Sequence, residues 1–249
     1  MGFLDFLFDK EKAQARQVEK LRKKLTNLWV QSPDRNDAAS QLFQIGSPEA
    51  LHALMERFKV QTQNTTYDIE EKTFVYDMLA GAGPAVGDVV KDNVRAEPAV
   101  INWQMRVLED VLPPQDLAAF IQELLSTMDV GYERDPVKKE QLILRSQGYT
   151  DYPDLQKEIA RFTISDNEDI RFQSVSAVVK RDEEWARDSL RANLRIEDSG
   201  RIQSMVCDRM AQKGWTALED LENDELRTEI KEALPPQYHL TEDGLIRRK

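Results

Sequence analysis

The sequence has few of the residues on which most metal sites, disulfides and nucleophilic catalysts depend. Among its 249 residues it has one cysteine, Cys207, and two histidines, His52 and His239. One cysteine cannot form a disulfide within the chain, which favours a reducing compartment, and the cytoplasm is the expected location. Two distant histidines offer no metal-ligand spacing. We therefore expect no metal, no cofactor and no catalytic residues.

Long apolar runs are also missing. No stretch approaches the roughly 20 apolar residues that would span a bilayer. The amino terminus is unlike a signal peptide, because Asp5 and Asp9 interrupt its short apolar run and a charged segment follows. Basic residues are fewer than acidic ones, and the net charge is −11. A negative net charge disfavours nonspecific binding to phosphate backbones, so no nucleic-acid partner is expected.

What the chain does have is a regular succession of helical segments. Glycine and proline number only ten each and gather at breaks. The breaks fall near residues 46, 83, 113, 148, 182 and 214, and apolar residues recur at helical spacing between them. A helix pair repeated every 30 to 45 residues or so is typical of an α-solenoid. The sequence therefore predicts an all-α fold, with about six antiparallel helix pairs over residues 32–215.

One pattern appears twice in residues 166–215. Arg171-Phe172-Gln173-Ser174-Val175 returns thirty residues later as Arg201-Ile202-Gln203-Ser204-Met205, and Glu184-Trp185 returns as Gly214-Trp215. We interpret each copy as two helices, with the tryptophan at the start of the second. Cys207 would then correspond to Ala177, as a small buried residue.

The stretch Glu168 to Val178 has an acidic start, then Ile-Arg, then small apolar residues. In this it resembles the HEAT-repeat family, and 135–138 and 198–202 fit the same motif in part. The resemblance covers roughly residues 34–215 as architecture. It implies a superhelical stack whose second helices line a concave surface that holds other macromolecules.

The two ends differ from the repeats. Residues 1–31 carry a net charge of +3, which leaves −14 on the remainder. An apolar tip is followed by a helix over residues 10–30, whose apolar stripe extends through Leu28 and Trp29. A basic stripe lies on the same helix. Residues 216–234 are predicted to form an acidic capping helix with Leu218, Leu221, Leu226 and Ile230 inside, and residues 235–249 an irregular tail.

Three interpretations of residues 1–31 stay open: a cap on the first repeat, an arm that docks into a partner, or a segment that contacts an anionic membrane. The candidate contact residues are the apolar tip and the basic stripe. They are Phe3, Leu4, Phe6, Leu7, Phe8, Arg16, Lys20, Lys23 and Lys24.

Two kinds of HEAT-like enzyme provide a contrast. Iron-dependent hydroxylases resembling deoxyhypusine hydroxylase need several His-Glu pairs, which this sequence lacks. HEAT-like DNA glycosylases need a basic groove with aromatic residues. Trp103, Trp185 and Trp215 could supply the aromatic residues, but the charge of the repeats is strongly acidic. The sequence therefore favours a non-enzymatic adaptor or scaffold. It would bind a protein partner with a basic segment through the solenoid surface, and the amino-terminal arm could add a further contact. The glycosylase and a membrane-associated adaptor are the alternatives.

Overall fold

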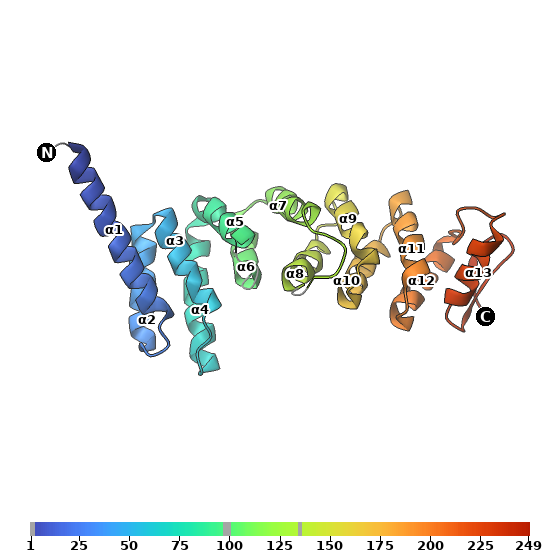
Figure 1. Ribbon diagram of the computed structural model, residues 1–249, viewed down its shortest axis with the longest axis horizontal. Coiled ribbons are helices and arrows are strands. Elements are labelled where there is room, and N and C mark those ends of the chain that lie inside the picture. The colour runs from blue at the N-terminus through green and yellow to red at the C-terminus, as the bar shows by residue number, and fades with distance from the viewer. Residues whose placement is uncertain (1–2, 97–100, 134–135) are drawn as a thin grey trace. The chain divides into compact units, whose positions relative to one another are not determined.

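Figure 1 shows the computed structural model, which is all-helical except for one small two-stranded sheet. It describes the backbone of residues 3–96, 101–133 and 136–249, and side chains within these ranges from Lys10 onward. The all-α prediction is confirmed. The chain divides into two compact units, residues 1–117 and 118–249. Among the described helices, none is both long enough and apolar enough to cross a bilayer.

Six α-helices form the first unit. They are α1 (Phe3–Thr26), α2 (Ser32–Ile45), α3 (Pro48–Met55), α4 (Thr65–Gly81), α5 (Gly87–Ala96) and α6 (Ile101–Val111). Short 3₁₀ helices at 56–59 and 83–86 follow α3 and precede α5. Successive helices pack together, as α2 does with α3 and α5 with α6. Alternate helices also lie side by side, because α2 contacts α4, α4 contacts α6, and α3 contacts α5.

The breaks in the first unit follow from local chemistry. Gly46 ends α2 with φ 64°, a left-handed conformation that residues with a Cβ avoid. The Ser47 hydroxyl then accepts a hydrogen bond from the Ala50 amide and caps α3. Asn64 caps α4 in the same way through the Tyr67 amide. These caps satisfy amides that would otherwise have no partner at the start of each helix.

Helix α1 ends earlier than the sequence predicts. Val18, Leu21 and Leu25 are buried where α1 packs against α2 and α3, as expected. The helix stops at Thr26, however, and Leu28 and Trp29 are 54% and 94% exposed. The predicted continuation of the apolar stripe is therefore wrong. Lys23 and Lys24 in the last turn of α1 are a typical C-terminal signal, since cations interact favourably with a helix carboxyl end.

A fully buried ionic network joins α2, α4 and the 3₁₀ turn between them. Arg35 donates to both oxygens of Glu71, at 2.8 and 2.6 Å. Arg57 donates to Glu71 Oε2 and to Asp68 Oδ1, both at 2.8 Å. Lys72 adds a contact to Asp68 at 2.7 Å. Charges taken out of water are tolerated only when their partners replace the lost hydration, and here each carboxylate has two cations.

Both carboxylates of this network have a lowered pKa. Burial alone would raise the pKa of Glu71, but hydrogen bonds from Arg35, Ser32 and Arg57 outweigh burial and lower it. For Asp68, burial is again opposed by hydrogen bonds, here from Lys72 and Arg57, and its pKa is lowered too. A carboxyl group with a lowered pKa in the folded state stabilises the fold above its unfolded pKa. That stabilisation is lost as pH falls through the lowered value.

We predict that Glu71→Gln lowers the free energy of unfolding by about 3 kcal/mol, because it leaves the buried Arg35 without a charged partner and Arg57 with Asp68 alone. Glu70→Gln, one position away and exposed, should change it by less than about 0.5 kcal/mol. Urea unfolding at pH 7 measures both. Repeating it down to pH 3 should show the gap between wild type and Glu71→Gln narrowing with acid. A gap that stays constant would contradict the assignment.

Helix α7 (Pro114–Ser126) begins in the first unit and continues into the second, in which the structure describes six further α-helices. These are α8 (Val137–Ser146), α9 (Pro153–Ala160), α10 (Glu168–Val178), α11 (Glu184–Ile196), α12 (Gly200–Lys213) and α13 (Asp224–Ala233). Alternate helices lie side by side here too: α8, α10 and α12 along one line, and α9, α11 and α13 along another. Apolar residues of α10 to α13 share one continuous core.

The buried positions of α10 and α12 follow a different spacing from the thirty-residue match in the sequence. Ile170, Ser174, Val175 and Val178 are buried in α10, and the buried residues of α12 lie thirty-two positions later. Those are Ile202, Val206, Cys207 and Met210. Cys207 therefore corresponds to Val175, and the assignment to Ala177 is wrong. Arg171 is buried against Glu197 at 2.8 Å, whereas Arg201 is exposed and lies over the Phe172 ring.

The carboxyl-terminal part also differs from the prediction. The capping helix covers only Asp224–Ala233, and residues 214–223 are not helical, so Trp215 does not open a helix. Leu218 and Ile230 are buried as predicted, but Leu221 is half exposed. The tail forms an antiparallel hairpin of β1 (Tyr238–Leu240) and β2 (Ile246–Arg248). Its alternate side chains Tyr238, Leu240 and Ile246 are buried in the core of this unit.

Candidate binding groove beside helix α1

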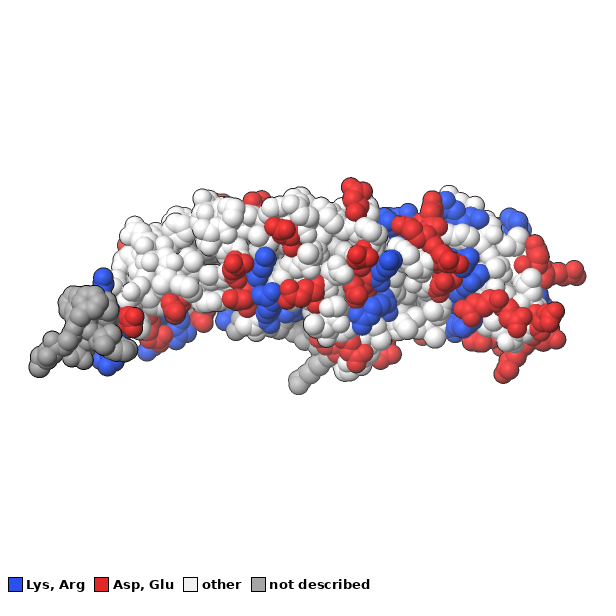
Figure 2. All heavy atoms as spheres, turned by 90° about the horizontal axis from the view of Figure 1, so that it is seen from above, with Lys and Arg blue, Asp and Glu red and all other residues white. Residues whose placement is uncertain are grey.

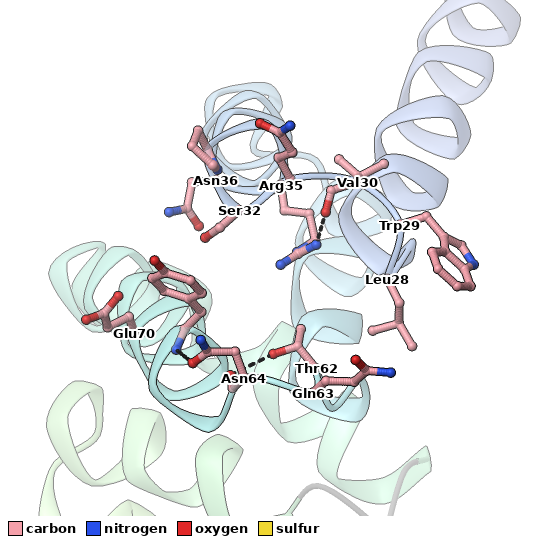
Figure 3. Close-up of a pocket in the computed structure, with 13 residues that line it drawn as sticks. Leu28, Trp29, Val30, Ser32, Arg35, Asn36, Thr62, Gln63, Asn64 and Glu70 are labelled. Carbon is pink, nitrogen blue, oxygen red and sulfur yellow. Dashed lines mark hydrogen bonds between the residues drawn. The ribbon is translucent and has the colours of Figure 1, made fainter.

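A groove of about 850 Å³ lies in the first unit. Three segments form its walls: the loop after α1, the first turns of α2, and the loop that leads into α4 (Figure 3). Its volume lies in the range of about 300 to 1,000 Å³ that is usual for ligand sites. The lining residues are Leu28, Trp29, Val30, Gln31, Ser32, Pro33, Arg35, Asn36, Thr62, Gln63, Asn64, Tyr67 and Glu70.

The buried ionic network fixes the two loops that form this groove. Arg35 donates to the carbonyl oxygen of Val30, in the loop after α1 (Figure 3). Arg57 donates to the Val60 carbonyl oxygen at 2.7 Å, and the Thr62 amide donates to Asp68 at 3.0 Å. Thr62 Oγ1 then donates to the Asn64 carbonyl oxygen. Hydrogen bonds from the buried charged residues therefore fix the backbone of both loops, while the outward side chains stay free to contact a ligand.

The groove combines exposed apolar side chains with uncharged polar ones. Trp29 and Leu28 stand on one side and Glu70 on the other (Figure 3). Tyr67, on the first turns of α4, is 52% exposed. Exposed aromatic side chains with one polar end are frequent at interfaces, since they bury large apolar areas yet can still form a hydrogen bond. Such a surface is suited to binding.

The predicted basic stripe is only partly available. Arg16, Lys20 and Lys23 line a shallow groove of about 550 Å³ on α1 together with Glu19. Lys23 is paired with Glu19 at 3.3 Å. Lys24 instead turns to α2, where Asp34 and Asp37 lie at 3.0 and 3.5 Å. Within the described residues, Arg16 and Lys20 are the members of the stripe without an ion pair.

The predicted apolar tip lies outside the residues whose side chains are described. The backbone of α1 is helical from Phe3, but the structure describes no side chain before Lys10. Phe3, Leu4, Phe6, Leu7 and Phe8 therefore stay a prediction as contact residues.

The other candidate residues from the sequence are buried or packed against neighbouring side chains. Cys207 is fully buried, and burial raises the pKa of its thiol to about 12, so it is protonated at neutral pH. His52 is half-buried and contacts the Asn93 amide at 3.0 Å. Trp103 stacks on Phe58. Among the described residues, no three His, Cys, Asp or Glu side chains come close enough to hold a metal ion.

Trp185 and Trp215 pack against the same core, but one lies in a helix and the other in a loop. Trp185 is the second residue of α11, whereas Trp215 follows the left-handed Gly214 that ends α12. Both are partly buried against the core of the second unit. Neither lines the groove of the first unit, whose tryptophan is Trp29.

Charge on the surface is mixed. Figure 2 shows one face of the molecule, on which lysine and arginine lie beside aspartate and glutamate. Many such neighbours are ion pairs one helical turn apart, for example Arg161 with Glu158 and Arg187 with Glu184, both at 2.6 Å. Towards the carboxyl end, the exposed acidic side chains of residues 219–232 make the surface strongly negative (Figure 2).

Comparisons with known proteins find no match: no family model, no curated protein and no solved structure resembles this chain significantly. The resemblance to the HEAT-repeat family stays a prediction.

The groove could have been recognised in part from the sequence. Asn27 and Ser32-Pro33 are signals of a helix end and a new helix start, and they bracket Leu28 and Trp29. The apolar spacing of Leu25, Leu28 and Trp29 conceals this, because it continues the period of α1 beyond its end. Nothing in the sequence indicates that Tyr67, nearly forty positions later, lies on the same groove.

We expect Trp29→Ala to change the free energy of unfolding by less than about 0.5 kcal/mol, because its side chain makes almost no buried contact. Leu25→Ala, one turn earlier and 1% exposed, should cost about 3 kcal/mol. Thermal and urea unfolding of the two variants make the comparison. If Trp29→Ala proved as destabilising as Leu25→Ala, Trp29 would belong to the core and not to an exposed groove.

Proposed function

We propose that this protein is a non-enzymatic adaptor that binds a protein partner through the groove beside α1. The observation that carries the proposal is the exposure of Trp29, Tyr67 and Leu28 around one groove of a folded unit. A large exposed aromatic side chain is unfavourable in water, and contiguous apolar surface of this kind typically marks an interaction site. Hot spots of protein interfaces are rich in tryptophan and tyrosine.

We further propose that the helix pairs form an α-solenoid resembling HEAT repeats. In each unit, alternate helices pack side by side, which is the neighbour pattern that a stack of helix pairs needs. The motif at Glu168–Val178 coincides with a complete helix, α10. A stacked array presents a rigid surface, so little conformational entropy is lost on binding.

The expected partner carries a basic segment. The net charge of −11 would attract such a segment and speed encounter at low salt. The same charge, and the mixed surface in Figure 2, argue against the DNA glycosylase alternative, which needs a basic groove. A cytoplasmic location is consistent with the single buried cysteine.

Affinity capture from the native cell tests the adaptor proposal. Trp29→Ala should lose a protein that wild type retains, because the substitution removes the largest exposed apolar surface of the groove. Tyr132→Ala is the matched control, since Tyr132 is 81% exposed but lies in the second unit. The control should retain that protein. If all three baits capture the same set of proteins in equal amounts, the groove is not the binding surface.

Peripheral membrane contact is a second candidate, supported by Arg16 and Lys20, which are exposed on α1 and have no ion pair with the side chains that the structure describes. Two cations near an anionic surface contribute only about 2 kcal/mol in total, so this contact needs the apolar tip as well.

Vesicles containing phosphatidylserine separate the two candidates. Deleting residues 1–31 is unsuitable as a test, because Val18, Leu21 and Leu25 belong to the core. The double variant Arg16→Glu, Lys20→Glu leaves the core intact. If the arm binds membranes, wild type should pellet with the vesicles and this variant should not. Equal sedimentation of the two would end the membrane proposal.

A further inference from the structure

The chemistry of the groove indicates which kind of segment it takes. Among the described residues that line it, Arg35 and Glu70 are the charged ones. The Arg35 guanidinium is occupied by Glu71 and the Val30 carbonyl oxygen, so it offers no charge to a ligand. Glu70 is exposed and has no ion pair among the described residues. One free carboxylate at the edge of an otherwise neutral groove favours a ligand with a single cationic group beside an uncharged stretch.

The neutral polar residues offer free hydrogen-bond donors, and the free side-chain amides also carry acceptor oxygens. Within the described part of the chain, the Trp29 indole N–H and the side-chain amides of Gln31, Asn36 and Gln63 have no protein partner. The Asn64 carboxamide oxygen is occupied by the Tyr67 amide, which leaves its NH₂ group free to donate. A ligand with free carbonyl oxygens can accept hydrogen bonds from these donors. Proline-rich backbone is such a ligand, because each proline keeps its carbonyl oxygen and lacks an N–H.

The aromatic side chains favour the same ligand. Grooves lined by exposed aromatic residues bind polyproline II segments, whose rings fit between the aromatic faces. These segments keep this extended conformation before binding, so they lose little entropy when they dock. Leu28, Val30 and Pro33 provide apolar contacts along the groove. A β-strand is a poorer fit, because no sheet edge lies among the lining residues, all of which are helical or loop.

We propose that the groove between Trp29 and Tyr67 binds a proline-rich segment in the polyproline II conformation, with a lysine or arginine beside it that pairs with Glu70. This inference rests on the proposed adaptor function and specifies the chemistry of its partner. The carboxamides and the indole N–H donate to the carbonyl oxygens of the segment. Glu70 sets its direction, because the cation must lie at the α4 end of the groove.

Fluorescence anisotropy of labelled synthetic peptides tests the proposal with the full chain. The probe is a short peptide of alternating proline and leucine that ends in arginine. It should bind saturably, and a peptide with glycine in place of every proline should bind at least about tenfold more weakly, because it must also lose its flexibility. Trp29→Ala and Tyr67→Ala should each weaken binding about tenfold or more, and Tyr132→Ala should leave it unchanged.

Charge reversal tests the role of Glu70. Glu70→Lys should weaken the arginine peptide about threefold or more at low salt, and the difference should shrink as salt screens the pair. Glu229→Lys, an equal reversal at an exposed position of α13, is the control and should have a much smaller effect. Exchanging arginine for glutamate in the peptide should reverse the difference between wild type and Glu70→Lys, because the variant then carries the opposite charge to the peptide.

The outcomes separate this proposal from the adaptor function. If the glycine and proline peptides bind equally, or if Trp29→Ala binds the proline peptide as wild type does, the inference is wrong. If no peptide binds while Trp29→Ala still loses its protein in affinity capture, the ligand class is wrong and the adaptor proposal stands. If capture is also unaffected, both fall.

Discussion

The first unit depends on one buried carboxylate, Glu71, and the two arginines that it holds. Arg35 comes from α2 and Arg57 from the turn after α3, so Glu71 on α4 ties three consecutive segments to one point. Both arginines make a further hydrogen bond besides the one to this carboxylate. Each also donates to a loop carbonyl, at Val30 or at Val60, and these two loops form the groove walls. Buried ion pairs are weak evidence for stability, since well-packed apolar residues often do as well. The network instead fixes the backbone of two loops that bury little surface of their own. The large side chains of these loops remain exposed to solvent.

The second unit uses a similar device. Arg171 is the fourth residue of α10, as Arg35 is the fourth of α2. It donates to both oxygens of Glu197 and also to the Ser165 carbonyl oxygen just before its own helix. Burial opposes ionisation of Glu197, yet hydrogen bonds from Arg171, Ser199 and Asn193 lower its pKa. In both units, then, an arginine near the start of a helix reaches a carboxylate on a later segment and a carbonyl on the preceding loop. The difference lies outside the network, because only the first unit leaves a tryptophan exposed beside it.

The fold class and most helix breaks could be predicted because they depend on local chemistry. Gly46, Ser47 and Pro48 specify a stop and a restart wherever they occur, and the stripes of α3 and α7 are buried as their periodicity indicates. The failures have a common cause. Arg171 and Arg201 match in sequence at a spacing of thirty residues, but they do not occupy equivalent positions. The buried residues of α10 and α12 are instead thirty-two positions apart. Leu28 and Trp29 keep the period of α1 after the helix has ended. The groove could not be predicted, because it joins residues 28–36 to 62–70, and that proximity is set by Glu71 and its arginines rather than by any local signal.

In this structure the buried network positions the two loops of the groove. Hydrogen–deuterium exchange of wild type and Glu71→Gln tests it most directly, with peptides that cover residues 27–36 and 60–70. We expect faster exchange in both loops of the variant, including the Thr62 amide, while residues 165–199 exchange at the wild-type rate. Unchanged exchange in the two loops, or an equal increase throughout the chain, would contradict it.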